Sequence, residues 1–475
     1  MIVRALRGRR LAGSFGSLAL LAMVGAGCAV RAPYAVPVAA PVVLKQAVEP
    51  AFAAQPYDAS WWRLFQDPVL ERLETKALTA NHDIRQAVAR VDQARAIFDD
   101  VSRDRYPQAG VNASVDVRQQ NIPGFTSTPI RTNTYRAGFD MFWEIDIFGG
   151  VRSAVRSAAA EAQGLDASLD DVRVSVAAEV ARSYFELRGV QQRLAVAERS
   201  LANQREALRL TEVRRDGGVG EEQDVASAAA SVAAVEASIP PLRAGLAAAR
   251  HRIAVLIGVR PSDLAEDLEP RAYAPLMTTL PLGQTGDLLR RRPDVRAAER
   301  RLAASTAREG IAAADLYPRI TVSGVLGILA GRGNLFGRWD SRQWAVTPAL
   351  SWVGTDLGSA RARLRGAEAA TREAFARYEQ TVLRAIEETE NALVDYQEEQ
   401  ARLDRLMEQA RQSARSADLA RVRYREGLTD FLDLLDAERT QLGAEDAVAQ
   451  IEAGVFTSVV GVYKALGGAE APATP

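Results

Sequence analysis

Four short segments of the chain alternate between apolar and polar residues. Over 111–117, four apolar residues (Val111, Ala113, Val115 and Val117) are separated by Asn112, Ser114 and Asp116. The segments 135–147, 320–328 and 344–352 alternate in a similar way, with aromatic residues near their ends. A period of two predicts β-strands with one apolar face, which suits a half-buried soluble sheet or a membrane barrel with lipid outside and water inside. Four such strands of similar length favour the barrel.

Long helical stretches follow these strands. Residues 367–426 contain neither Gly nor Pro, and a helix of roughly 60 residues would be about 90 Å long. Apolar and alanine residues recur there at a spacing near that of a coiled coil. The stretch 151–216 is similar but contains Gly164 and Gly189.

Each long helix is expected to end in a tight turn. Gly218 and Gly427 stand where a left-handed C-cap residue is needed. Return helices are expected to begin near Glu221 and Asp430. In the first of them, the pair Pro240-Pro241 is expected to interrupt and kink the helix.

The whole pattern is present twice. The segment 81–85 matches 292–296, and Tyr106-Pro107 matches Tyr317-Pro318, both 211 residues later. Beyond that point the offset is 209, and it pairs Trp143 with Trp352, Gly218 with Gly427, Asp224 with Asp433 and Gly258 with Gly467. The two-residue difference fits the loops 119–133 and 330–342. We therefore expect two structural repeats, 57–259 and 260–467, each with a helix, two strands and a helical hairpin, followed by a flexible tail, 468–475.

The N-terminus has the features of an export signal. Four arginines within residues 1–10 precede an uncharged stretch, 11–27, which ends in small residues before Cys28. This order predicts a signal peptide over 1–27. It resembles the bacterial lipoprotein signal, in which the Cys becomes the lipid-bearing first residue, and an ordinary signal with an incidental Cys is the alternative. A lipid-anchored Pro/Ala-rich leash over 28–56 follows, and no later apolar stretch predicts a membrane-spanning helix.

Composition excludes several classes of function. The 475 residues carry 59 basic and 60 acidic side chains, and this balance argues against nucleic-acid binding. One Cys and two His allow no intrachain disulfide and make a zinc site unexpected. The acidic pairs Asp99-Asp100 and Glu387-Glu388 are adjacent in helical stretches, and no nucleophile elbow or phosphate loop is present. We therefore expect no enzyme activity and no cofactor, with a secreted enzyme or a periplasmic lipid-anchored coiled-coil structural protein as weaker alternatives.

Four strands are too few for a closed barrel. Open sheet edges are not tolerated in lipid, and transmembrane barrels begin at about eight strands. The strands must therefore be shared between chains. Three copies would supply twelve strands, and this argument leaves a dimer with eight open.

Three motifs resemble those of outer-membrane efflux lipoproteins of the TolC superfamily, NodT-type branch. They are SWWRLFQDPVL at 60–70, WEIDIFGG at 143–150 and RRPDVRAAE at 291–299. The resemblance implies an α+β membrane protein: a homotrimer with one 12-stranded transmembrane β-barrel, four strands per chain, continued by a long periplasmic coiled-coil barrel.

The same resemblance implies a function. Such a protein would lie in the bacterial outer membrane, extend into the periplasm and passively conduct small molecules such as drugs as the exit duct of a tripartite efflux system. Its partners would be outer-membrane lipid, a periplasmic adaptor protein and an inner-membrane transporter of the resistance-nodulation-division type. The outer-membrane duct of a type I protein secretion system is the alternative.

Candidate functional residues lie at the hairpin tips. The family pattern matches Tyr424, Asp433 and Asp436 to a periplasmic gate, with Asp224 as the repeat equivalent of Asp433. Asp433 and Asp436 share a helix face, so a trimer would hold a ring of carboxylates that attracts cations. Solvated acids at a helix start are the alternative, as is simple packing for Tyr424. The expected adaptor contacts, with turn chemistry as their alternative, are Gly218, Val219, Gly427 and Leu428.

Overall fold

The computed structural model describes residues 34–37, 44–48, 51–55, 60–121, 128–271, 273, 279–283, 291–354 and 356–468. The predicted signal peptide, Cys28 and most of the tail lie outside the described residues. The chain forms two compact units. The first contains 1–38, 90–165 and 297–379, and the second contains 39–89, 166–296 and 380–475. Two long helices, α4 (Gly150–Asp216) and α8 (Leu357–Arg425), contribute residues to both units.

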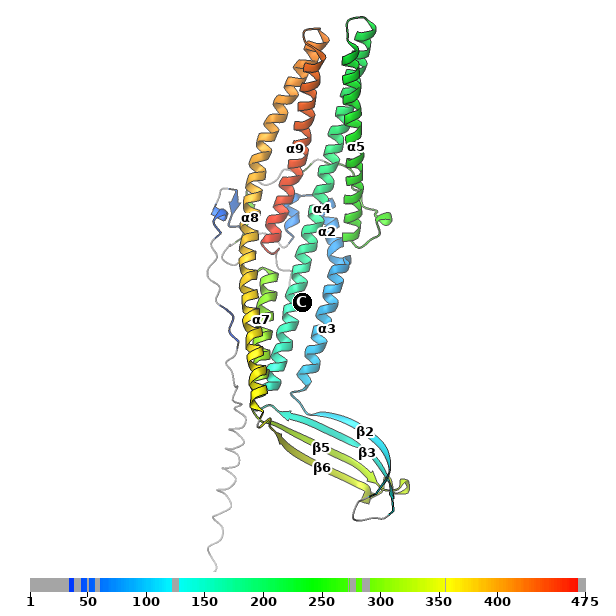
Figure 1. Ribbon diagram of the computed structural model, residues 1–475, viewed down its shortest axis with the longest axis vertical. Coiled ribbons are helices and arrows are strands. Elements are labelled where there is room, and N and C mark those ends of the chain that lie inside the picture. Colours follow the sequence, from blue (N-terminus) through cyan, green and yellow to red (C-terminus); the bar gives the residue numbers. More distant parts are fainter. Residues whose placement is uncertain are drawn as a thin grey trace, which may run out of the picture. The chain divides into compact units, whose positions relative to one another are not determined.

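The first unit contains a four-stranded antiparallel sheet of order β2-β3-β5-β6 (Figure 1). Its strands are β2 (Gln108–Gln120), β3 (Ile130–Ile145), β5 (Arg319–Ala330) and β6 (Arg342–Ser351). The predicted loop 119–133 was too long, because β2 and β3 continue to pair as far as Gln120 and Ile130, whereas the predicted loop 330–342 agrees with the end of β5 and the start of β6 to within one residue. These end segments are polar, so their hydrophobic pattern does not reveal the pairing of their backbones.

Helices α3 (His82–Arg103) and α7 (Pro293–Ala314) precede the two pairs of strands. Gly164 of α4 lies against α7. A Cβ atom on Gly164 would lie 3.4 Å from the Cβ atom of Arg300 in α7, which is an ordinary van der Waals contact.

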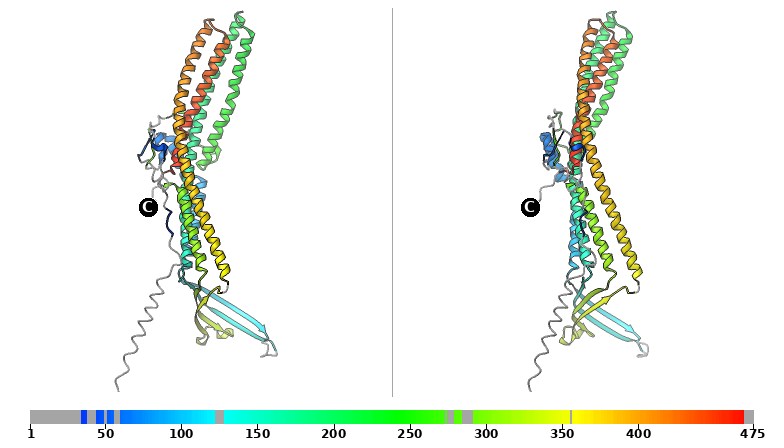
Figure 2. Two further views of the ribbon diagram at one scale, coloured as in Figure 1. Left: turned by 60° about the vertical axis from the view of Figure 1, so that its left-hand side comes forward. Right: turned by 90° about the vertical axis from the view of Figure 1, so that its left-hand side faces the viewer.

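The second unit contains two helical hairpins. Helix α4 turns into α5 (Glu222–Leu256), and α8 turns into α9 (Phe431–Ala465), and each pair lies side by side in all views (Figures 1 and 2). A Cβ atom on Gly189 would lie 2.6 Å from the Cβ atom of Ala453, so glycine is required where α4 meets α9.

The prediction that Pro240-Pro241 interrupts the first return helix was wrong, because α5 is one helix through both prolines. Each proline removes the N–H that would bond the carbonyl four residues earlier. Those carbonyls belong to Glu236 and Ala237, which are exposed, so water can satisfy them. By length and composition alone, α5 is the one helix of the described chain that could cross a membrane. Apolar helices that are packed within a protein share this length and composition.

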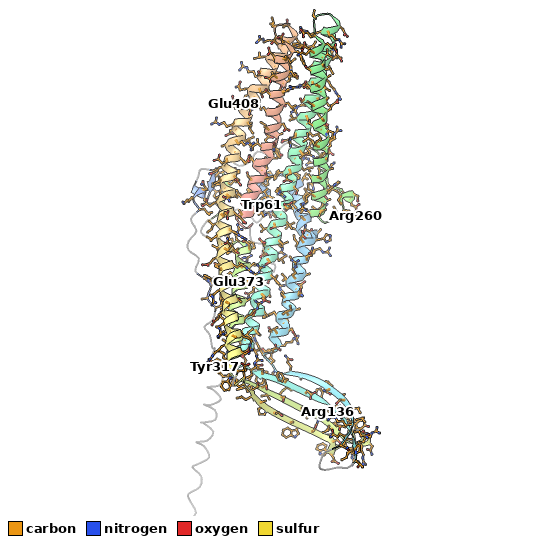
Figure 3. The ribbon with its side chains drawn as sticks, viewed as in Figure 1. Trp61, Arg136, Arg260, Tyr317, Glu373 and Glu408 are labelled. Atoms are coloured by element: carbon orange, nitrogen blue, oxygen red, sulfur yellow. The ribbon has the colours of Figure 1, made fainter. Side chains whose placement is uncertain are left out.

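The first sequence motif builds the aromatic core of the second unit. Trp61, labelled in Figure 3, is 2% exposed and stacks on Tyr463 with ring centroids 5.6 Å apart. Phe65 packs edge-on against Phe185 at 4.6 Å. Asp67 caps α2 (Pro68–Ala80), because its carboxylate accepts a hydrogen bond of 2.8 Å from the Val69 amide. The motif therefore fixes the start of α2 on the hairpins.

The other two motifs also have structural roles. The Arg292 guanidinium is buried and donates to the Ala465 carbonyl at 2.7 Å, at the end of α9. In the first repeat, the Asn81 amide donates to the equivalent carbonyl, Leu256, at 2.9 Å. Asp146 of the third motif accepts from the Arg152 amide at 2.8 Å at the start of α4. In both repeats, a side chain just before the helix that leads into the strands therefore holds the end of the return helix.

The predicted leash, 28–56, is partly structured. A 3-10 turn at Gln46–Val48 precedes β1 (Phe52–Ala53), which pairs in parallel with β4 (Leu280–Pro281). The Lys45 amide donates to the Glu390 carboxylate at 2.7 Å. A two-residue strand has no detectable period, so the sequence pattern could not predict these contacts.

Candidate functional site

The strand register joins the predicted apolar faces into one surface. Val111, Phe139, Leu326 and Trp344 form one cross-strand row, with exposed fractions of 80%, 60%, 63% and 78%. The next row contains Ala109, Met141, Gly324 and Val346. The predicted alternation is therefore confirmed across all four strands. A contiguous exposed apolar surface indicates an interaction with lipid or with another apolar surface.

The opposite face of the sheet is polar on strands β2 and β3. It contains Asn112 and Asp116 of β2, which alternate with the apolar residues of that strand, and Arg136, Asp140 and Glu144 of β3. Arg136, labelled in Figure 3, is exposed on this face. One apolar face and one charged face are what a sheet between lipid and water requires.

Two edges of this sheet have unpaired backbone groups. Strands β2 and β6 each have one neighbour in the sheet order, and all thirteen residues of β2 are exposed. An unpaired edge is a template for another strand. Edges of this kind are not tolerated in a bilayer, so a membrane location requires β2 and β6 to pair with strands of other chains.

Two tryptophans attach the sheet to the helices that precede it. The Trp143 indole N–H donates to the Arg105 carbonyl at 3.2 Å, and the Trp352 indole N–H donates to the Leu316 carbonyl at 3.1 Å. These bonds are repeat equivalents, and the duplicated pattern pairs the two tryptophans without indicating what they do. The signal available was the Tyr-Pro pair beside each acceptor carbonyl. Tyr317 of the second pair, labelled in Figure 3, stacks on Phe148 at 4.8 Å.

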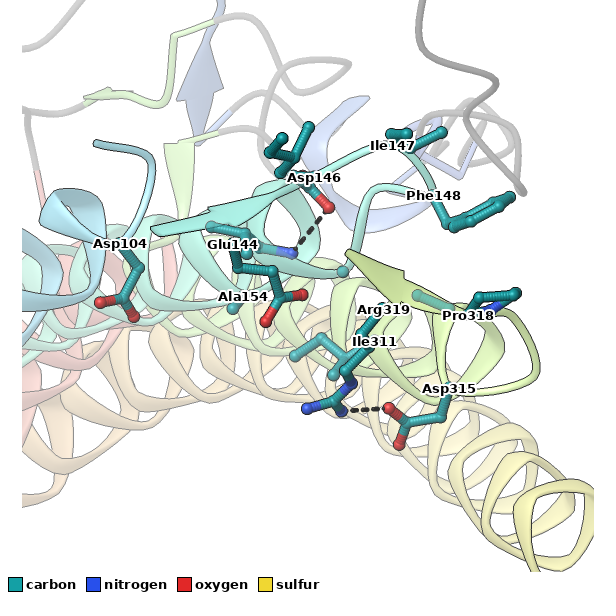
Figure 4. A pocket seen from close by; sticks show the side chains of 14 residues that line it. Asp104, Glu144, Asp146, Ile147, Phe148, Ala154, Ile311, Asp315, Pro318 and Arg319 are labelled. Atoms are coloured by element: carbon teal, nitrogen blue, oxygen red, sulfur yellow. Dashed lines mark hydrogen bonds and ion pairs between the residues drawn. The ribbon is translucent and has the colours of Figure 1, made fainter. Parts of the chain in front are cut away.

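A small pocket lies at the same junction (Figure 4). It has a volume of about 170 Å³, and its charged lining includes Asp104, Glu144, Asp146, Asp315 and Arg319. Arg319 forms an ion pair with Asp315, and Asp146 forms one with Arg152 at 3.2 Å. Within the described part of the chain, no group of three or more His, Cys, Asp or Glu residues is arranged to hold a metal ion.

The two hairpin tips have the same backbone geometry. Gly218 and Gly427 have φ angles of 76° and 72°, which confirms the predicted left-handed caps. Each tip has the paired hydrogen bonds of a Schellman motif: Gly218 N to Arg215 O (2.9 Å) and Val219 N to Arg214 O (3.0 Å), repeated as Gly427 N to Tyr424 O (3.1 Å) and Leu428 N to Arg423 O (2.8 Å).

Each tip presents one apolar side chain to its surroundings. Val219 is 70% exposed and Leu428 is 68% exposed. A Cβ atom added to Gly218 or Gly427 would meet nothing within 4 Å. Both tips are therefore accessible in the single chain, and the adaptor contact predicted for these four residues stays a prediction.

Tyr424 is part of the packed interior below its tip. It is 3% exposed, and its ring packs edge-on against Phe431 with centroids 5.6 Å apart. The Arg214 guanidinium lies 4.6 Å above the ring and also donates to the Tyr424 carbonyl at 2.7 Å. Burial raises the pKa of Tyr424, while Arg214 lowers it and the Asp224 carboxylate raises it. The ring thus has a packing role, which joins the two hairpins through Arg214.

The three predicted gate aspartates have different surroundings. Asp433 and Asp436 are both exposed, on the side of α9 away from the buried Leu434 and Leu435. Asp433 accepts a hydrogen bond from the Thr429 hydroxyl. Asp224 is half-buried in α5. Within one chain these carboxylates do not form a cluster that could hold a metal ion, so a ring of carboxylates requires several copies.

Sequence reasoning missed a buried polar link between the hairpins. Glu438 in α9 is 5% exposed and accepts from the Gln204 amide of α4 at 3.0 Å and from the Arg421 guanidinium of α8 at 2.8 Å. Burial raises the pKa of Glu438, and Arg421 opposes this. Its only signal in the sequence is an acid among apolar residues on the packed side of α9.

Comparisons with known proteins agree with this geometry. The family described as outer membrane efflux protein matches residues 73–259 and 285–468. The pyoverdine export outer membrane protein OpmQ of Pseudomonas putida is 32% identical over 95% of this chain and 96% of its own. Nodulation protein T of Rhizobium leguminosarum bv. trifolii is 30% identical over 80% of this chain and 81% of its own. Both matched family segments contain one strand pair and one helical hairpin.

Solved structures give the same result. The outer-membrane channel OprN superimposes with a TM-score of 0.90 at 46% identity, covering 92% of this chain and 99% of that channel. The outer membrane protein VceC of Vibrio cholerae has a TM-score of 0.81 at 26% identity, over 87% of this chain and 99% of its own. These similarities confirm the resemblance to the NodT-type branch of the TolC superfamily that the three sequence motifs indicated, together with the fold that it implies.

Proposed function

This chain belongs to the outer membrane efflux protein family and is an efflux channel of the bacterial outer membrane, and from this we propose that three copies assemble into one duct that passively conducts small molecules, such as drugs, to the exterior. The observation that carries the proposal is the sheet with one apolar face, one polar face and two unpaired edges. Pairing β6 of one copy with β2 of the next would close twelve strands into a barrel, above the minimum of about eight.

The long helices support the periplasmic part of the proposal. Helices α4 and α8 contain 67 and 69 residues, and roughly 70 residues of helix extend about 100 Å. We propose that the helical hairpins of three copies form a coiled-coil tunnel with the tips at its periplasmic end. Asp433 and Asp436 would then ring the mouth, with Asp224 and Tyr424 beside them as further gate residues.

The partners of the duct are also part of the proposal. An outer-membrane duct cannot export by itself, so we propose that it works with an inner-membrane resistance-nodulation-division transporter and a periplasmic adaptor. The exposed Val219 and Leu428, held by Gly218 and Gly427, are the proposed adaptor contacts. Relatives named as parts of a toluene efflux pump and an antibiotic efflux pump, both of Pseudomonas putida, support this arrangement.

We propose no catalytic activity and no cofactor for the chain itself. Its family is one of outer-membrane efflux proteins, whose task is conduction. The proposed organisation of the chain remains a signal peptide over 1–27, a leash with lipid on Cys28 and two repeats over 57–259 and 260–467.

The assembly is tested by measuring both mass and conductance. The detergent-extracted protein is expected to have the mass of three chains and to form discrete channels in a planar bilayer. Native mass spectrometry and single-channel recording provide the two measurements. A monodisperse monomer without conductance would contradict the proposal.

The barrel is expected to hold the protein in the membrane without its lipid. The variant Cys28→Ser, exported behind a cleavable signal that is not a lipoprotein signal, should still yield membrane-bound trimers. A lipoprotein anchor with several acyl chains can by itself hold a protein in the membrane. Removing the anchor therefore shows whether the barrel alone keeps the protein there. The measurement is the fraction of protein in the outer-membrane pellet, and recovery as a soluble periplasmic protein would contradict the barrel.

The carboxylate ring is expected to bind multivalent cations from the periplasmic side. Like charges crowded in a narrow mouth repel one another, and a multivalent cation relieves that repulsion. The double variant Asp433→Asn with Asp436→Asn should therefore weaken cation block and cation preference without loss of the trimer. The measurement is single-channel current with cation added to one side at a time.

The control for the ring is Asp404→Asn, which removes an exposed charge from α8. It should leave the block unchanged. An unaltered block in the double variant would show that Asp433 and Asp436 are only solvated acids near a helix start.

A further inference from the structure

A described part of the N-terminal leash lies against the helices of the first unit. The Tyr34 hydroxyl donates to the Glu299 carboxylate of α7 at 2.6 Å. Its ring packs against a buried cluster formed by Ala160 of α4 with Ala303 and Ala304 of α7. Tyr34 is therefore attached both by an apolar contact and by a hydrogen bond to a charged group.

The acceptor carboxylate is itself held in place. The Arg300 guanidinium donates to Glu299 at 2.6 Å and to the Gln163 side chain of α4 at 3.0 Å. The same guanidinium lies 6.0 Å from the centroid of the Tyr34 ring. On α8, Tyr378 is also near, since burial and the Glu299 carboxylate raise its pKa. Groups from three helices thus surround the phenol, and a hydrogen bond to an ionised acceptor is stronger than a neutral one.

We propose that these residues form a seat for Tyr34 that holds the leash on the helices and limits how far the lipid-bearing N-terminus can extend from them. The Tyr34 seat consists of Ala160, Gln163, Glu299, Arg300, Ala303, Ala304 and Tyr378. The limit on the reach of the lipid rests on the proposed attachment at Cys28. The contacts of Tyr34 do not depend on that attachment. Glu299 is the last residue of the RRPDVRAAE motif. The proposed channel function does not explain why a carboxylate stands at this position.

The effect of the seat on reach follows from chain length. Tyr34 is six residues after Cys28, and six extended residues span at most about 20–22 Å. If Tyr34 were released, the next described attachment would be Leu44, which is 3% exposed and precedes the Lys45 bond to Glu390. The free segment would then have sixteen residues, with a maximum span of about 53–58 Å. The seat therefore shortens the reach of the lipid roughly threefold.

The test uses a nitroxide label beside the seat. Val36 is 59% exposed, so Val36→Cys can be labelled in the purified, detergent-extracted full-length protein. Continuous-wave electron paramagnetic resonance then reports the label's mobility. We expect an immobilised spectrum in the parent and a largely mobile one after Tyr34→Ala. Tyr34→Phe keeps the ring and should raise the ratio of mobile to immobile label about tenfold, by loss of a hydrogen bond to a charged group.

Three controls complete the design. Glu299→Gln keeps an acceptor and should have a smaller effect than Tyr34→Phe. Tyr106→Ala removes a tyrosine that is 68% exposed on the same unit and should change nothing. Trimer content is checked for each variant, so that a spectrum from unfolded protein is not mistaken for a released leash.

Two outcomes separate the seat from the lipid. Equal mobility in the parent and in Tyr34→Ala would overturn the seat. Cys28 is the chain's one cysteine, so labelling of the protein without Val36→Cys measures the unmodified thiol. Full labelling there, together with an immobilised Val36→Cys signal, would reject the lipid attachment and retain the seat.

Discussion

Replacing Arg292 by methionine is expected to destabilise the helical part of the protein by about 1–3 kcal/mol, the cost of leaving polar groups without their hydrogen-bond donor. The Arg292 side chain is 7% exposed and forms ion pairs with Asp294 at 2.7 Å and Glu388 at 2.6 Å. It also donates to the carbonyl of Ala465, at the end of α9. Methionine fills similar space but removes the donor to both carboxylates, and it leaves the Ala465 carbonyl with the Thr389 hydroxyl at 3.2 Å.

The measurement is the free energy of unfolding of the detergent-extracted protein in urea, followed by helical circular dichroism. The matched control is Arg291→Met, the same substitution at the preceding residue, which is exposed. It is expected to change the free energy by less than about 0.5 kcal/mol. Equal effects of the two substitutions would show that the Arg292 contacts do not support the fold.

A positive charge on the apolar face of the sheet is expected to prevent assembly. Val111→Arg would place a guanidinium against lipid, which costs up to about 4 kcal/mol per chain, depending on its depth in the bilayer. Three copies in one barrel would be destabilised by up to about 12 kcal/mol. The expected result is loss of heat-resistant trimers from the outer-membrane fraction, measured on unboiled gels.

The neighbouring residue provides the control for this face. Asn112→Arg adds the same side chain one position later in β2, where the strand faces the other way. It is expected to leave the trimer intact, because that side of the barrel faces water. A harmful Asn112→Arg and a harmless Val111→Arg would show that the two faces were assigned the wrong way round.

Much of this fold could be predicted from periodicity and from the duplicated pattern. Alternation over 111–117 identified the apolar face because strand residues two apart share a side. Gly218 and Gly427 identified the hairpin turns, since a positive φ favours glycine. In both cases the structure is determined by residues that are close together in the chain, so a short segment of sequence is enough to predict it.

Long-range contacts could not be predicted in this way. The β1–β4 pair joins Phe52 to Leu280, and two residues are too few for a period. The ring of Tyr424 is buried by Phe431 and Arg214, whereas the sequence pattern left a packing role and a gate role open. The tryptophan bonds to Arg105 and Leu316 use backbone carbonyls, which any residue provides.

The duplication has a consequence for the cooperativity of assembly. The β3–β5 pair joins the two repeats within a chain, and in the proposed trimer β6 and β2 would join them between chains. Six similar repeats would then alternate around one ring, with every second junction made covalent by the chain itself. The equilibrium amount of assembled barrel therefore depends on the third power of the chain concentration. If the repeats were separate chains, it would depend on the sixth power of their concentration. Fusion also lets the halves diverge: Asp436 of the second repeat corresponds to Ser227 of the first, so the proposed gate positions have two carboxylates in one hairpin of each chain and one in the other.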